Sequence, residues 1–197
     1  AAPIVVVLLE CLAALVPRRP AARGARPRID VLIPAHNEER VLAATLRSVQ
    51  TQLRSGDRIL VVADNCTDGT ADVARTCGID VVERQHETDR GKGFALDFGV
   101  RQLNARNGGV VVIVDADCTL GPGTLDALAA DCGATGRPIQ ASYVMNCPPN
   151  PSPRDLVSRV AVTVKNIVRQ RGATPLGGPA ILTGSGMAFP WETLSRA

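Results

Sequence analysis

The chain has 197 residues, of which 45% are apolar, 21% charged and only 3% aromatic. This composition excludes a disordered tail, a collagen-like repeat and a small disulfide-stapled module. The formal net charge is +3, but five arginines against Glu10 place +4 within residues 1–28 and leave −1 over residues 29–197. A slightly acidic, aromatic-poor body argues against nucleic-acid binding.

The first 28 residues differ from the rest. Residues 1–16 are apolar apart from Glu10, and residues 17–28 are rich in arginine and proline. The apolar run is shorter than the roughly 20 residues of an isolated span. We interpret residues 1–28 as the end of a membrane-anchoring segment plus a linker, with an ordinary buried helix as the alternative. The arginines favour a membrane-associated protein whose domain faces the cytoplasm.

The six cysteines form no C-x-x-C pair and lie at no zinc-finger spacing from a histidine. We therefore expect reduced thiols in a reducing, cytosolic environment rather than a metal or disulfide framework.

From residue 29 onward, short β-branched runs alternate with longer amphipathic stretches. Strands are predicted at 29–33, 58–62, 80–82 and 110–114, with helices at 38–53, 69–77 and 91–103 between them. This order predicts a parallel sheet with helices on both faces and a ligand site beyond the carboxyl ends of the strands. Further on we expect helices at 121–130 and 153–169, and strands at 138–145 and 180–183.

Polar residues follow the first two predicted strands. Asn37 is expected to cap the next helix, with Glu38 in its first turn, whereas His36 is expected to face the ligand crevice. Asp64 directly follows two buried valines, where it can accept hydrogen bonds from a nucleobase imide. Asp68, in the turn after Asp64, has an ordinary interpretation as a turn residue.

The fourth strand ends in Asp115-Ala-Asp117. If this segment is extended, both carboxylates point the same way, and a cation is needed to neutralise them. Oxygen ligands suit Mg²⁺ or Mn²⁺ shared with substrate phosphates, and a solvated pair in a turn is the alternative. An EF-hand is excluded because Leu120 occupies the position that requires glycine.

A glycine-rich segment precedes the helix at 91–103. Its exposed amides, with Lys92 and Arg90, can hold a diphosphate. A dinucleotide fingerprint is not met, because Leu96 stands where the third glycine is required.

Five motifs in order carry a family resemblance: VLIPAHNEE (31–39), VVADNCTDGT (61–70), RGKG (90–93), DAD (115–117) and TGSGMAF (183–189). Over residues 29–191 the chain resembles the donor-binding part of a family-2 glycosyltransferase. The similarity extends to bacterial membrane-attached synthases of the cellulose, chitin and hyaluronan type. It implies an α/β GT-A fold, with a Rossmann-like, mainly parallel sheet flanked by helices and truncated at its C-terminus.

The resemblance also implies a reaction. A sugar would move from a nucleotide-sugar, expected to be a UDP-sugar, to a hydroxyl of a glycan or lipid-linked acceptor. The transfer would proceed with inversion, would need Mg²⁺ or Mn²⁺, and would serve exopolysaccharide or cell-envelope glycan synthesis.

The residue roles come from the same resemblance. Asp117 would coordinate the metal, and Asp115 would be the catalytic carboxylate near the sugar. The general base is expected beyond residue 197, because Glu192 is the only acidic residue after Asp155 and no acidic residue follows it directly. The donor would contact Pro34, Ala35, His36, Glu38, Asp64, Lys92, Asp115 and Ala116. The acceptor side would be lined by Gly184, Ser185, Gly186 and Met187.

Two other function classes remain. A non-catalytic sugar-nucleotide-binding domain would explain the expected lack of a base. A nicotinamide oxidoreductase fits less well, because the glycine pattern fails and an Asp-x-Asp pair has no use there.

Overall fold

The computed structural model describes residues 2–16, 25–103, 109–178 and 181–196. The chain forms two compact units. The helical unit comprises residues 1–21 and 140–183, and the sheet unit comprises residues 22–139 and 184–197.

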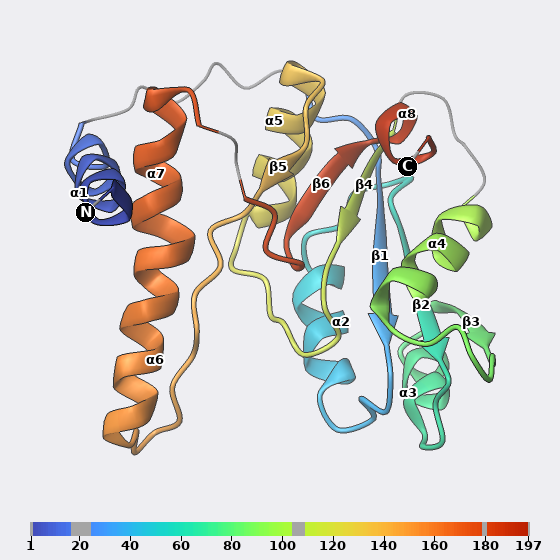
Figure 1. Ribbon diagram of the computed structural model, residues 1–197. Helices are drawn as coiled ribbons and strands as arrows, with labels where there is room; N and C mark the ends of the chain where they lie inside the picture. The colour runs from blue at the N-terminus through green and yellow to red at the C-terminus, as the bar shows by residue number, and fades with distance from the viewer. Residues whose placement is uncertain (1, 17–24, 104–108, 179–180, 197) are drawn as a thin grey trace. The chain divides into compact units, whose positions relative to one another are not determined.

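The sheet has six strands in the order β3-β2-β1-β4-β6-β5 (Figure 1). Its strands are β1 (Ile29–Ala35), β2 (Arg58–Asp64), β3 (Asp80–Arg84), β4 (Val110–Ile113), β5 (Ile139–Gln140) and β6 (Met187–Pro190). The pairs β1–β2, β2–β3 and β1–β4 are parallel, and β4–β6 is antiparallel. The mainly parallel α/β sheet predicted from the sequence, with its first four strands, is therefore confirmed.

The parallel strands are connected by the helices α2 (Leu42–Gln50), α3 (Thr70–Thr76) and α4 (Lys92–Gln102). α5 (Thr124–Thr135) follows β4, and the short α8 (Trp191–Leu194) follows β6. Because crossovers are right-handed and the chain reverses direction across the sheet after β3, α4 lies on the face opposite α2 and α3. Successive residues such as Val31 and Leu32, whose side chains point to opposite faces, are both fully buried, as a sheet covered on both faces requires.

Two predicted strands differ from the structure. The strand expected at 138–145 is only β5, and the following residues up to 148 are irregular. The strand expected at 180–183 is wrong where the structure describes it, since 181–183 are irregular and residue 180 lies outside the described ranges. The real strand is β6, because Gly184 and Gly186 turn the chain with positive φ and Met187 then pairs with Ile113.

The helical unit contains α1 (Ala2–Ala13), α6 (Pro153–Thr163), a π-helical turn (Val164–Val168), α7 (Arg169–Ala173) and a 3-10 turn (Thr174–Leu176). The predicted start at Ser152-Pro153 is confirmed, because Ser152 and Asp155 form a capping box. α1 contacts α7 through an ion pair of Arg169 with Glu10 at 2.6 Å.

None of the helices within the described ranges combines the length and the apolar character needed to cross a membrane. The anchoring role expected for residues 1–28 stays a prediction.

Candidate functional site

A cavity of about 430 Å³ lies in the sheet unit beyond the carboxyl ends of β1, β2 and β4. This is the edge at which parallel sheets bind ligands. All eight residues predicted to contact the donor lie in its wall, together with the predicted metal ligand Asp117. The wall is formed by Pro34, Ala35, His36, Glu38, Asp64, Asn65, Arg90, Gly91, Lys92, Ala95, Asp115, Ala116 and Asp117.

One side of the cavity is formed by the loop after β1, which is tied to the loop after β2. The side chain of Asn37 accepts a hydrogen bond from the Thr67 N–H at 2.8 Å, and the Glu38 N–H donates to Thr70 Oγ1 at 2.8 Å. Thr70 in turn donates to Asp68 Oδ1 at 2.5 Å. These bonds fix the loop that presents His36 and Glu38 to the cavity.

The expected cap on α2 is wrong. The helix begins only at Leu42, after Val41, with no side-chain cap. Asn37 instead adopts a left-handed conformation with φ of 56° and bonds across to the neighbouring loop. A contact between two loops far apart in sequence has thus overridden the local capping preference.

Asp64 stands at the end of β2 and is only 4% exposed. Its Oδ1 accepts hydrogen bonds from Arg84 Nη1 at 2.7 Å and from the Asn65 side chain at 3.2 Å. Its backbone carbonyl lies 2.7 Å from Nδ1 of the exposed His36. The carboxylate is therefore held in one orientation at the cavity wall.

The opposite side of the cavity is cationic. Lys92 opens α4, and its ammonium contacts the carboxylate of Asp115 and donates to the Gly184 carbonyl at 2.5 Å. Gly91, just before the helix, has φ of 105°, a backbone conformation that favours glycine. The first amides of a helix have no intrahelical acceptor, so this end of α4 can receive a phosphate oxygen.

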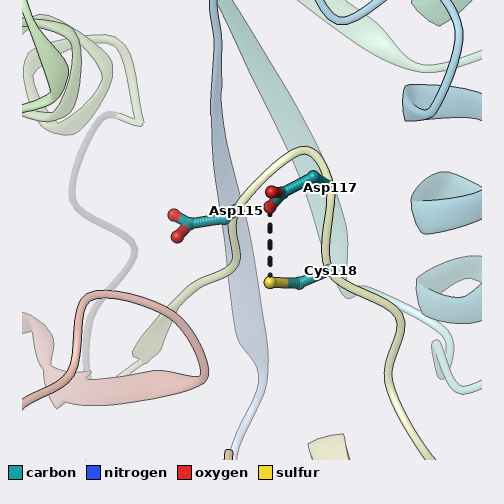
Figure 2. Close-up of side chains that lie close together, drawn as sticks. All are labelled: Asp115, Asp117 and Cys118. Carbon is teal, nitrogen blue, oxygen red and sulfur yellow. Dashed lines mark hydrogen bonds between the residues drawn. The ribbon is translucent and has the colours of Figure 1, made fainter. Parts of the chain in front are cut away.

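Within the described residues, Asp115, Asp117 and Cys118 bring one ligand atom each within 4.8 Å of one another. Figure 2 shows the three side chains around a single turn, with Cys118 donating to Asp117 at 3.5 Å. The expected extended segment is wrong, since β4 ends at Ile113 and the chain turns at Ala116 and Asp117. The turn, rather than strand periodicity, brings the two carboxylates together.

The chemistry of this group fits a hard divalent cation. Burial raises the pKa of the Cys118 thiol against the lowering effect of a hydrogen bond with Ser185, and the Asp117 carboxylate raises it further. Asp115 and Asp117 supply carboxylate oxygens. Burial also raises the pKa of Glu38, and the carboxylates of Asp117, Asp68 and Asp115 add to that shift. Carboxylates thus cluster around Asp115 and Asp117, and their oxygen ligands suit Mg²⁺ or Mn²⁺.

The segment predicted to line the acceptor side borders Asp115 rather than the cavity wall itself. Ser185 Oγ accepts a hydrogen bond from the Asp115 N–H at 3.0 Å, and the Gly186 N–H donates to the Ile113 carbonyl at 2.8 Å. The Gly184 carbonyl accepts a hydrogen bond from the Lys92 ammonium, which also contacts the Asp115 carboxylate. The acceptor role of residues 184–187 stays a prediction.

Two residues of the wall and one behind it were not predicted from the sequence. Asn65 and Ala95 line the cavity, and Arg84 holds Asp64 from behind. Arg84 ends β3, so the rule that ligands bind at carboxyl strand ends was a signal for it. Asn65 carried a weaker signal, because asparagine tolerates its left-handed conformation, with φ of 51°.

The mainly parallel sheet, its antiparallel β6 and the cavity at the strand ends define a GT-A-type α/β domain. Residues 30–182 match the family described as Glycosyl transferase family 2. The chain belongs to this family.

Three similar proteins illustrate the relationship. The probable glycosyltransferase YdaM of Bacillus subtilis is 36% identical over 101 residues, which are 47% of this chain and 23% of that protein. A mannosyltransferase from Pyrobaculum calidifontis, in complex with GDP-Man and Mn²⁺, has a TM-score of 0.65 at 25% identity. Its match covers 100% of this chain and 55% of that one.

The third is glucosyl-3-phosphoglycerate synthase from Mycobacterium tuberculosis, in complex with Mn²⁺, UDP-glucose and phosphoglyceric acid. It has a TM-score of 0.56 at 26% identity, with 89% of this chain and 63% of that one covered. The chain thus spans less than two thirds of the length of each of these proteins. The finer likeness to cellulose, chitin and hyaluronan synthases stays a prediction.

Proposed function

We propose that this chain is the donor-binding part of a metal-dependent glycosyltransferase that moves a sugar from a nucleotide-sugar to an acceptor hydroxyl. One observation carries the proposal. A single cavity in a family-2 chain places the fixed Asp64 carboxylate on one side and Lys92 with Asp115 and Asp117 on the other. These groups complement the two ends of a nucleoside diphosphate.

The donor class follows from the chemistry of Asp64. An ionised carboxylate offers only acceptor oxygens, so it selects a base edge that presents N–H donors. Uracil and guanine both do so, and the two similar structures contain a uridine and a guanosine nucleotide. We propose a UDP-sugar as the donor, with a GDP-sugar as the other candidate.

The reaction breaks the bond between the anomeric carbon and the diphosphate oxygen, and negative charge develops on that oxygen. A divalent ion held by Asp117, with Asp115 beside it, would supply neutralising charge there. Lys92 and the first amides of α4 stabilise the same charge from the other side. Because Asp115 borders the segment 184–187, we propose that the sugar end of the donor lies next to that segment.

The acceptor hydroxyl is proposed to attack from the face opposite the diphosphate, which inverts the anomeric centre. Its proton passes to a carboxylate, and we propose that this base is not supplied by these 197 residues. Glu192 does not suit the role, because the neighbouring Trp191 N–H donates to the Gly109 carbonyl. That contact lies at the start of β4, at the opposite end of the strand from Asp115.

We also propose that the protein is membrane-associated, faces the cytoplasm and acts on a glycan or lipid-linked acceptor in exopolysaccharide or cell-envelope synthesis. The helical unit supports attachment, because α6 exposes Leu156, Val157 and Val160 alongside Arg154 and Arg159. Apolar and basic side chains together suit an anionic lipid surface. Cosedimentation with vesicles tests the attachment, and we expect more protein in the pellet with anionic than with zwitterionic vesicles. Equal amounts of pelleted protein with the two kinds of vesicle contradict it.

Calorimetry with UDP and Mn²⁺ tests the donor site. We expect UDP to bind only with the metal present, and Asp117→Asn to weaken binding at least 10-fold. Asp97→Asn is the matched control, since Asp97 is an exposed carboxylate on α4 that pairs with Arg101. Equal loss in both variants, or full binding by Asp117→Asn, refutes the role of Asp117.

Transfer of labelled sugar separates the enzyme from a non-catalytic binding domain. We expect little or no turnover by these 197 residues and metal-dependent turnover by a longer chain that includes the proposed base. Binding without turnover in the longer chain favours the binding-domain alternative. Strong turnover by the 197 residues refutes the proposal that the base lies outside them.

A further inference from the structure

Arg84 is a nearly buried cation that stands behind the cavity wall. It is the last residue of β3 and lies directly opposite Asp64 in the parallel register of β2 and β3. Its Nη1 donates to Asp64 Oδ1 at 2.7 Å, and the two side chains are only 11% and 5% exposed. The pair is therefore shielded from solvent, where charge-assisted hydrogen bonds are strong.

Arg84 also reaches the other side of the cavity. The same Nη1 donates to the backbone carbonyl of Asp89 at 2.8 Å, and its guanidinium lies 5.7 Å from the ring centroid of Phe94. Asp89 directly precedes Arg90, Gly91 and Lys92, all of which line the cavity. One guanidinium thus contacts Asp64, the proposed acceptor for the nucleobase, and Asp89, which precedes the residues proposed to hold the diphosphate.

A third contact comes from the backbone of the same residue. The Arg84 carbonyl accepts a hydrogen bond from the Asn65 N–H at 2.7 Å, and Asn65 lines the cavity in its left-handed conformation. Arg84 is absent from the wall itself. Its influence on a ligand must therefore act through the residues that it holds.

We propose that Arg84 is a positioning residue that couples the two halves of the donor site. It fixes Asp64 as an acceptor for the nucleobase and holds the segment 89–92 at the spacing of a nucleoside diphosphate. This inference rests on the proposed function for its ligand. Removal of the guanidinium would leave Asp64 buried without its cation and would free the Asp89 carbonyl.

The chain offers a closely matched control in Arg58. Its guanidinium pairs with the Asp30 carboxylate at 2.8 Å and donates to the Leu103 carbonyl at 2.6 Å. Arg58 thus makes the same two kinds of contact on the same sheet, but at the opposite end of the strands. A general loss of sheet stability should therefore appear in both variants.

The experiment measures the affinity for UDP in the presence of Mn²⁺ by calorimetry. We expect Arg84→Met to weaken binding at least 10-fold, Arg84→Lys to recover part of the loss, and Arg58→Met to stay within about twofold of the wild type. In the double variant with Asp64→Asn, the loss should be smaller than the sum of the two single losses, because both changes remove the Arg84–Asp64 interaction, and larger than that of Asp64→Asn alone, because only Arg84→Met also frees the segment 89–92. Additive losses, or equal losses in Arg84→Met and Arg58→Met, overturn the proposal.

A second measurement needs no nucleotide. Amide hydrogen exchange of the peptide spanning residues 85–94 should speed up in Arg84→Met and not in Arg58→Met. If the wild type binds neither UDP nor GDP, the proposed function fails, and this exchange still decides whether Arg84 positions the segment. Unchanged exchange in Arg84→Met overturns the positioning role.

Discussion

α4 carries Lys92 into the cavity and packs on the sheet through Gly99, which makes this glycine the most informative position for a stability test. A Cβ at residue 99 would lie 2.5 Å from Cδ1 of Leu32 and 2.8 Å from Cγ2 of Val62. Both neighbours are fully buried. Carbon atoms in contact prefer separations of about 3.5–4.0 Å, so the helix must shift or the core must deform.

Two effects oppose each other in Gly99→Ala. Alanine favours a helix over glycine by about 1 kcal/mol, whereas overpacking a dense core costs about 1–3 kcal/mol. We expect the steric cost to win, with a net loss of about 1 kcal/mol. Gly93→Ala is the matched control on the same helix, because a Cβ there meets no atom within 4 Å. That variant should gain up to about 1 kcal/mol.

The fluorescence of Trp191 reports directly on this core. It is the only tryptophan of the chain and packs against the buried cluster that contains Leu32 and Val62. Urea titrations followed at this residue should give a lower midpoint for Gly99→Ala and an equal or higher one for Gly93→Ala. A midpoint that rises equally in both variants refutes the close packing of α4 on the sheet.

Three further predictions concern charge and capping. Asp57→Asn should lower the free energy of unfolding by about 1–3 kcal/mol at neutral pH, because the buried carboxylate accepts from Arg26 and from the Arg54 N–H, each at 2.7 Å. Burial raises the pKa of Asp57, but these hydrogen bonds outweigh it and hold the pKa below its usual value. The gap between wild type and variant should therefore persist above about pH 4 and close as the pH falls through the folded pKa, and a gap that widens in acid contradicts this. Lys92→Met should weaken binding of UDP with Mn²⁺ about 10-fold in calorimetry with little change in melting temperature, since the lysine is partly exposed. Ser152→Ala should lower the free energy of unfolding by about 1 kcal/mol, measured by circular dichroism, because it removes the N-cap of α6. Ser158→Ala, inside the same helix, should leave the free energy of unfolding unchanged.

The sequence was sufficient for the alternation of elements and for most of the cavity wall. Short β-branched runs that are bounded by polar or turn residues favour buried strands, and a parallel sheet gathers whatever follows them at one edge. Asp64, Asp115 and Asp117 were therefore predictable as neighbours, although they are up to 53 residues apart. Ser152-Pro153 likewise marked a helix start, because capping depends on adjacent residues.

Tertiary structure decided what depends on contacts between distant segments. Asn37 bonds to Thr67 rather than capping α2, and the last strand begins at Met187 because Ile113 is its partner. Arg84 acquires its partner only when β3 lies beside β2, because its place at a strand end does not by itself identify Asp64 as the carboxylate that it contacts. Local propensity is worth about 1 kcal/mol or less per residue, and a hydrogen bond formed across the fold equals or exceeds it.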